Sequence, residues 1–248
     1  MPQKARQVLE AARTIALGSD AASVIALTRV RAKRAPSEST VRLRPLAGKS
    51  VTIRPYPRTV DVHVVHDTFI GRHHRLPKGM RPTSIVDLGA NIGLTMADYA
   101  EVYPDARIVG VELDPGNAVL ATRNTASYPN CRVVQAAVWS ENGSISYDPS
   151  GEEWSYTVGP GSASAESLTI DALLKRMDLD RVDVLKMDIE GAEQQVLQAG
   201  GDWPERVGMI KVEIHRGYAL DEAQSDLRQL GFSVEIDSRH WSALIARR

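Results

Sequence analysis

The sequence of 248 residues predicts an α/β fold in which helices cover both faces of a doubly wound, mainly parallel sheet. Short apolar strands alternate with amphipathic helices from Ser84 to the end of the chain. Turns rich in Gly, Pro, Asn and Asp separate these segments. The length suits one such domain with an N-terminal extension, which we place at residues 1–60, ahead of a main domain at 61–248.

The extension is predicted to contain two helices and a hairpin. Gly18-Ser19-Asp20 supplies a helix stop followed by a helix cap. Ala47-Gly48-Lys49 lies between two short runs of alternating apolar and basic residues, which is a hairpin signal. The His-rich run from His63 to Pro82 predicts a helix and loop that lie over the mouth of a binding site. The expected elements are helices 4–17 and 20–34 and strands 41–44 and 51–54.

The main domain is predicted from alternating strand and helix patterns, with Asp114-Pro115 opening one of the helices. The stretch 149–165 is rich in Gly, Ser and Pro, and we expect a mobile loop near the substrate, with Trp154 and Tyr156 available to stack on it. The expected strands are 84–87, 107–112, 131–138, 144–147, 182–188, 209–214, 232–236 and 241–246. The expected helices are 93–102, 115–127, 169–177, 192–199 and 220–230.

Composition limits the setting and the partners of the chain. No apolar run approaches the roughly 18 residues of a membrane span, and the first residues lack the apolar core of a signal peptide. The lone cysteine, Cys131, favours a reducing, cytoplasmic setting and is expected to be a buried apolar residue.

Charge is unevenly distributed along the chain. Residues 1–80 hold 15 Lys and Arg against 5 Asp and Glu, although the net charge of the whole chain is −1. We expect the basic segment to pack on the acidic remainder or on a second copy in a homodimer. We expect no nucleic acid, because no aromatic residues are interleaved with the basic ones.

The turn from Ser84 to Gly93 indicates a nucleoside-containing cofactor. It joins a buried strand to a helix, and its glycines let a ligand approach the main chain. Asp87 stands where a dinucleotide fingerprint has its first glycine; its carboxylate would repel a pyrophosphate and suits the ammonium group of S-adenosylmethionine. Glu112 follows Gly89 by 23 positions, near the roughly 20-residue spacing at which an acid meets ribose hydroxyls.

Two later strand ends carry acids and a histidine. Asp188 and Glu190 follow one strand, and Glu213 and His215 end the next. Because parallel strands end at the same edge of a sheet, these side chains are expected to converge. His215 is our candidate general base, since the ordinary pKa of histidine lies near neutral pH. Asp188 and Glu213 are candidate ligands for Mg²⁺.

Together these segments resemble the FkbM family of S-adenosylmethionine-dependent methyltransferases over about residues 60–246. The resemblance rests on the motifs Val86-Asp87-Leu88-Gly89-Ala90-Asn91-Ile92-Gly93, Glu112, Val134-Gln135-Ala136-Ala137-Val138-Trp139, Lys186-Met187-Asp188-Ile189-Glu190-Gly191-Ala192-Glu193 and Glu213-Ile214-His215. It implies a Rossmann-like class I methyltransferase fold with a seven-stranded sheet and O-methylation of a sugar or a polyketide-derived hydroxyl. It also implies that the cofactor is held by Asp87, Gly89, Ala90, Asn91, Gly93, Glu112, Leu113, Gln135, Ala136 and Ala137. The residues that it places toward the acceptor are Asp188, Glu190, Glu213 and His215.

We therefore predict an O-methyltransferase that acts on a hydroxyl of a small carbohydrate or oligosaccharide. An RNA or protein methyltransferase, docking its substrate on the basic N-terminal segment, is the main alternative. A nicotinamide-dependent oxidoreductase is disfavoured by Asp87, and a binding module without turnover stays open.

Overall fold

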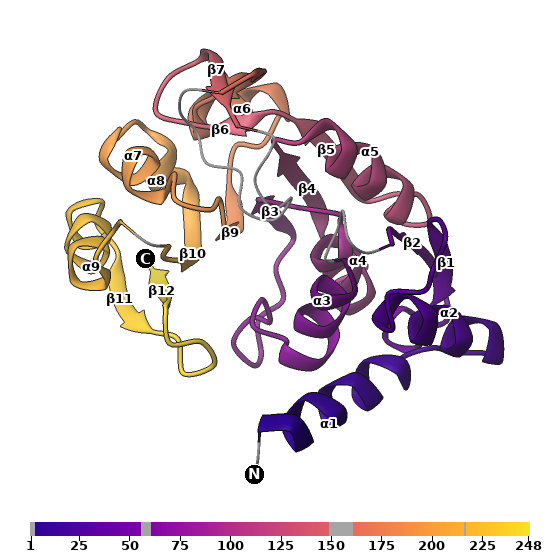
Figure 1. Cartoon of the computed structure of the whole chain (residues 1–248). Coiled ribbons are helices and arrows are strands. Elements are labelled where there is room, and N and C mark those ends of the chain that lie inside the picture. The colour runs from indigo at the N-terminus through magenta and orange to yellow at the C-terminus, as the bar shows by residue number, and fades with distance from the viewer. Residues whose placement is uncertain (1–2, 56–60, 149–160, 216) are drawn as a thin grey trace.

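A seven-stranded sheet forms the centre of the computed structural model, which describes residues 3–55, 61–148, 161–215 and 217–248 (Figure 1). The strand order is β11-β12-β10-β9-β3-β4-β5. Strand β12 runs antiparallel to both of its neighbours, and all other neighbouring pairs are parallel. The predicted fold class is confirmed. The strands are β3 (Ser84–Leu88), β4 (Arg107–Glu112), β5 (Cys131–Gln135), β9 (Val182–Met187), β10 (Val207–Glu213), β11 (Ser233–Ile236) and β12 (Ala243–Arg247).

Helices cover both faces of the sheet. Side chains alternate along a strand, so Ile85 belongs to the hydrophobic core on one face and Val86 to the core on the other. Helices α4 (Leu94–Val102) and α5 (Pro115–Asn124) pack on the first face. The second face is covered by α6 (Ile170–Arg176), α7 (Glu193–Gln198), α8 (Trp203–Arg206) and α9 (Leu220–Gln229). Within the described ranges no helix has the length and apolar character needed to cross a membrane.

The N-terminal elements pack on the first face, at the α4 and α5 side of the sheet (Figure 1). Their buried residues, among them Leu27, Leu43 and Ile53, share one hydrophobic cluster with Ile85. The predicted division near residue 60 falls in 56–60, outside the described residues, and stays a prediction. The elements are α1 (Gln3–Ile15), α2 (Ala21–Arg31), β1 (Ser39–Arg42), the 3₁₀ turn η1 (Arg44–Leu46), β2 (Ser50–Ile53), α3 (Asp61–His66) and the π-helical turn η2 (Asp67–Gly71).

Local signals explain two of these elements. The Asp20 side chain accepts a hydrogen bond from the backbone of Ser23 and caps α2, as predicted. Strands β1 and β2 form the predicted antiparallel hairpin. The side chain of Asn124 on α5 bonds both the N–H (2.7 Å) and the carbonyl (3.1 Å) of Thr52, and thereby joins this hairpin to the main domain.

The structure differs from the predicted order around residue 136. The single strand predicted over 131–138 ends at Gln135, where Ala136 N–H donates to the Glu112 carbonyl, and the chain then leaves the main sheet. Strand β6 (Ala137–Val138) pairs instead with β8 (Ala163–Leu168), which also pairs with β7 (Gly143–Tyr147). Residues 163–165 had been expected in a loop, because β8 has little apolar alternation. Residues 149–160 of that loop, with Trp154 and Tyr156, lie outside the described residues.

Candidate functional site

A cavity of about 420 Å³ opens at the carboxyl ends of the central parallel strands, where open α/β sheets bind ligands. Most of the predicted cofactor residues line it, as do all four residues predicted to face the acceptor. The first group comprises Gly89, Ala90, Asn91, Glu112, Leu113, Ala136 and Ala137, and the second Asp188, Glu190, Glu213 and His215.

The turn after β3 depends on two glycines, at φ 85° for Gly89 and φ 80° for Gly93. A Cβ on Gly89 would lie 1.8 Å from the carbonyl oxygen of Asp188, so only glycine lets the ends of β3 and β9 meet. A Cβ on Gly93 would lie 2.9 Å from the Cα of Ala121. Gly93 therefore packs α4 against α5, and it is not among the residues that line the cavity.

The Glu112 carboxylate is held at the end of β4 by three donors. The N–H of Asn91 donates to Oε2 (2.8 Å), while the N–H of Asp114 (2.9 Å) and Nδ2 of Asn117 (3.4 Å) donate to Oε1. Burial raises the pKa of Glu112 to about 7, against the lowering effect of these hydrogen bonds. A carboxylate offers about four lone-pair positions, so one remains to accept a hydroxyl.

Asp87 is fully buried and does not border the cavity. Its Oδ1 lies 3.0 Å from the Lys186 amine, which itself lines the cavity and lies 3.3 Å from Oδ2 of Asp188. Burial lowers the pKa of Lys186, but the charges of Asp87 and Asp188 outweigh it and raise that pKa overall. Asp87, predicted to face a cofactor ammonium, is buried away from the cavity lining and pairs with Lys186 instead.

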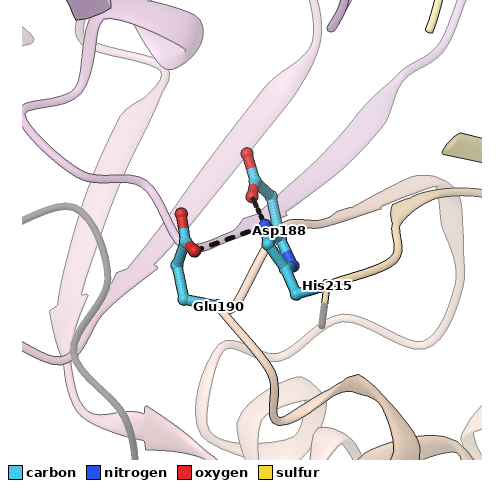
Figure 2. A group of neighbouring side chains, drawn as sticks. All are labelled: Asp188, Glu190 and His215. Atoms are coloured by element: carbon cyan, nitrogen blue, oxygen red, sulfur yellow. Dashed lines mark ion pairs between the residues drawn. The ribbon is translucent and has the colours of Figure 1, made fainter. Parts of the chain in front are cut away.

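His215 lies among three carboxylates. Its Nε2 is 3.5 Å from Asp188 and 3.3 Å from Glu190, both drawn in Figure 2. Its Nδ1 is 2.8 Å from the buried Glu193, the first residue of α7. Glu193 also accepts from the N–H of Gly191 (3.0 Å), which fixes the loop that carries Glu190.

This arrangement decides the charge of the imidazole. Burial lowers the pKa of His215, but the hydrogen bond to Glu193 and the charges of Glu190, Glu193 and Asp188 prevail and raise it to about 9. Burial, together with the charge of Asp188, raises the pKa of Glu190 to about 7. At neutral pH His215 is thus protonated, whereas the pKa of Glu190, like that of Glu112, lies near 7. Glu190 also holds φ 53°, a strained conformation of the kind found at functional sites.

Comparison with known proteins identifies the family of the chain. The Methyltransferase FkbM domain matches residues 87–234, more than half of the chain. The chain belongs to the FkbM methyltransferase family. It is an S-adenosylmethionine-dependent methyltransferase.

Two curated relatives are similar at low identity. The 2-O-methyltransferase NoeI of Sinorhizobium fredii is 25% identical over 167 residues, which cover 59% of this chain and 68% of the relative. The hexuronic acid methyltransferase AglP of Haloferax volcanii is 27% identical over 168 residues, which cover 65% of this chain and 69% of the relative. Among solved structures, a precorrin-6y C5,15-methyltransferase from Geobacter metallireducens is 15% identical at a TM-score of 0.45, covering 72% of this chain and 84% of that one.

Both predicted metal ligands, Asp188 and Glu213, line the same cavity, and their role as ligands stays a prediction. Asp188 is grouped with Glu190 and His215, whose ligand atoms lie within 4.8 Å of one another. Glu213 lies instead beside His240, with 3.7 Å between Oε1 and Nδ1. Gln135, predicted to hold the cofactor, is exposed and does not line the cavity, because the strand that carries it ends there.

Part of the segment predicted over 63–82, up to His74, reaches the cavity. Asp67, His73 and His74 contribute to its lining. His66 does not; its ring bonds the hydroxyl of Thr14 instead (2.9 Å). His74 is buried against Asp98, with 2.6 Å between Nε2 and Oδ2.

Lys211 and His240 also line the cavity and were not among the predicted site residues. Lys211 is a buried residue of β10 and pairs with the buried Asp237. His240 reaches the cavity because β12 runs antiparallel and begins at the edge where its neighbours end. Alternating charge and apolar residues in β10 signalled Lys211, whereas only the strand pairing reveals His240.

Proposed function

We propose that the chain transfers a methyl group from S-adenosylmethionine to a hydroxyl of a sugar or oligosaccharide. The observation that carries the proposal is the cluster of Asp188, Glu190 and His215 in one cavity with the Gly89 turn and Glu112. The names of NoeI, a 2-O-methyltransferase, and AglP, a hexuronic acid methyltransferase, support a saccharide hydroxyl as the acceptor.

The residues around the glycine turn suit the cofactor. Glu112 has the carboxylate, the burial and the spare acceptor position that ribose hydroxyls need. Residues Gly89 to Asn91 line the cavity, where a ligand can contact their main chain. Ala136 and Ala137 contribute small apolar side chains to the same lining. When bound, S-adenosylmethionine supplies a methyl group activated by a positively charged sulfur.

The task of the chain is then to position the acceptor hydroxyl and to take its proton. We assign Glu190, whose pKa is about 7, as the general base that takes the proton of the acceptor hydroxyl. His215, predicted for this role, is already protonated at that pH. His215 is assigned as the positioning group: it holds Glu190 and Asp188 at 3.3 and 3.5 Å while Glu193 fixes its ring.

The same cluster offers an alternative role, as ligands of a divalent cation, for which His215 would give up its proton. Two carboxylates and an imidazole within 4.8 Å suit Mn²⁺ or another transition metal better than Mg²⁺, which prefers oxygen ligands alone. A bound cation would lower the pKa of the acceptor hydroxyl. Titration of the chelator-treated protein with Mn²⁺, followed by electron paramagnetic resonance, tests this role: binding lost in His215→Ala supports it, and no binding to the wild type refutes it.

The proposed reaction is tested with labelled S-adenosylmethionine and a panel of mono- and oligosaccharides, with bulk RNA and a protein mixture in parallel. Label in a saccharide supports the proposal. Label in RNA or protein alone would replace it by the alternative acceptor classes. The inactive reference is Glu190→Gln, which keeps the size of the side chain and removes the carboxylate.

Two further expectations belong to the same proposal. The lone cysteine favours a cytoplasmic setting for the reaction. The basic N-terminal helices favour a homodimer, and sedimentation velocity at micromolar concentration separates a dimer from a monomer.

A further inference from the structure

A basic groove adjoins the cavity on the side of the segment before β3. It is formed by residues 71–72, 75–83 and 102–106 together with Arg239, and its volume is about 970 Å³. Among its lining residues are five cationic side chains and one acid, Asp105. The cationic residues of this basic groove are Arg72, Arg75, Lys78, Arg81 and Arg239.

The positive charge of the groove is largely unneutralised. Arg75 pairs with Asp98 at 2.7 Å, and Arg239 donates to backbone carbonyls, among them that of Leu76 (3.2 Å). Lys78 and Arg81 are exposed and have no ion-pair or hydrogen-bond partner within the part of the chain that the structure describes. The groove therefore holds excess positive charge.

Two histidines separate the groove from the cavity. His73 and His240 line the cavity, and their rings meet edge to face with 4.7 Å between centroids. Each is the sequence neighbour of a groove residue, since Arg72 precedes His73 and Arg239 precedes His240. Nδ1 of His73 lies 3.0 Å from the Arg239 carbonyl oxygen. Figure 1 shows the loops before β3 and before β12 facing each other at this place.

This wall is also linked to the catalytic cluster. His240 faces Glu213 at 3.7 Å, and Glu213 lines the cavity together with His215. A molecule with one group in the cavity and another in the groove would therefore pass over the His73–His240 pair. Carboxylates line the cavity around His215, whereas cationic side chains line the groove. The two sites therefore suit chemically different groups of one acceptor molecule.

The chemistry of the groove favours a multiply charged oxyanion. Arginine presents a planar fork of donors that matches phosphate oxygens, and lysine adds a mobile point charge. A neutral saccharide would leave these charges without partners. A single carboxylate would match one cation, whereas a diphosphate can contact several of them at once.

We propose that the basic groove binds the phosphate or diphosphate group of the acceptor, so that the sugar is methylated while it is attached to a phosphorylated carrier. This inference rests on the proposed saccharide O-methylation, and it names the acceptor class. The carrier is either a nucleoside diphosphate or a lipid diphosphate, which share the group that the groove recognises.

The first test measures binding alone, with inorganic diphosphate as the probe. Calorimetry at low salt is expected to detect binding to the full chain, weakened roughly tenfold or more in Lys78→Glu/Arg81→Glu. Lys4→Glu/Arg13→Glu reverses two exposed cations on α1, outside the groove, and is expected to bind as the wild type does. Absence of binding to the wild type, or equal binding to both double variants, overturns the proposal whatever the chain methylates.

The second test compares a free hexose or hexuronic acid, the same sugar on a nucleoside diphosphate, and the same sugar on a prenyl diphosphate. A KM at least tenfold lower for either diphosphate-linked sugar, lost in Lys78→Glu/Arg81→Glu, supports the proposal and identifies the carrier. Equal KM values for free and linked sugars overturn it and leave saccharide methylation intact. If no saccharide takes up label, the proposed saccharide methylation is wrong. The calorimetric measurement still decides whether the groove binds diphosphate.

Discussion

The Lys186 amine lies 3.0 Å from Oδ1 of the fully buried Asp87, across neighbouring strands β9 and β3. The register pairs these two residues directly, although they are 99 positions apart in the chain. The same amine lies 3.3 Å from Asp188 in the cavity. One buried cation thus joins the core of the sheet to the candidate catalytic cluster.

Removal of this cation is expected to destabilise the fold as well as the site. Lys186→Met leaves Asp87 buried without its partner, which costs about 3–5 kcal/mol in comparable cases. In Asp87→Asn/Lys186→Met the loss should be smaller, because no buried charge is left unpaired. Urea titration gives the free energy of unfolding of Lys186→Met, Asp87→Asn and the double variant. If the loss in the double variant equals the sum of the losses in the two single variants, the pair does not interact.

The activity should depend on pH as a bell between the pKa values of Glu190 and His215. Glu190 accepts a proton only when ionised, so kcat/KM for the acceptor should rise through about pH 7. His215 holds the cluster as a cation, so kcat/KM should fall through about pH 9. The measurement uses saturating cofactor, and the two limbs report the titration of the cluster as a whole.

Substitutions test which residue causes each limb of the pH profile. Glu190→Gln should lower kcat roughly 100-fold or more and remove the acid limb. His215→Gln should remove the alkaline limb and leave cofactor affinity unchanged. A profile that is flat from pH 6 to pH 10 in the wild type would contradict both roles.

The sequence predicted the elements whose signals are local. Ile85 and Val86 lie in different hydrophobic cores because successive side chains of a strand point to opposite faces of the sheet. Glu112, Asp188 and Glu213 lie together at one edge because they stand at the ends of parallel strands. The position of Asp87 could not be predicted, because its partner Lys186 is brought to it only by strand pairing.

The missed elements have the same cause. Strand β8 is polar and is stabilised by pairing with β6 and β7, so its alternation is weak. His240 reaches the cavity through the antiparallel pairing of β12 with β10, and neighbouring Trp241 is 83% exposed there. Strand β8 and the position of His240 therefore depend on pairing between distant segments, which local residue patterns do not reveal.

Cofactor affinity should weaken in acid because of Glu112. Burial raises its pKa to about 7, and a protonated carboxyl accepts ribose hydroxyls poorly. If binding requires the ionised form, the Kd for S-adenosylhomocysteine should rise about tenfold between pH 8 and pH 6. Calorimetry across this range measures the slope. Glu112→Gln should bind more weakly and lose the slope, and a slope that persists in this variant would move the effect to another group.

The hairpin of the N-terminal segment should control the same affinity through Arg54. This side chain donates to Asn117 at 2.7 Å, and Asn117 donates to Glu112 at 3.4 Å. Because Arg54 also pairs with the buried Asp61 at 2.9 Å, the test is Arg54→Met/Asp61→Asn, which removes both charges of this pair. We expect the Kd for S-adenosylhomocysteine to rise about three- to tenfold, since roughly one hydrogen bond that fixes Glu112 is lost.

The matched control on the same hairpin is Arg42→Met/Asp20→Asn. Arg42 is exposed and lies 3.7 Å from Asp20, and asparagine at position 20 still caps α2. This variant should bind the cofactor product as the wild type does. If both double variants weaken binding equally, the hairpin acts through overall stability and the path from Arg54 to Glu112 has no role of its own. If only the Arg54 variant weakens it, the N-terminal segment is part of the cofactor site, because the hydrogen bonds run from its hairpin through Asn117 to the carboxylate.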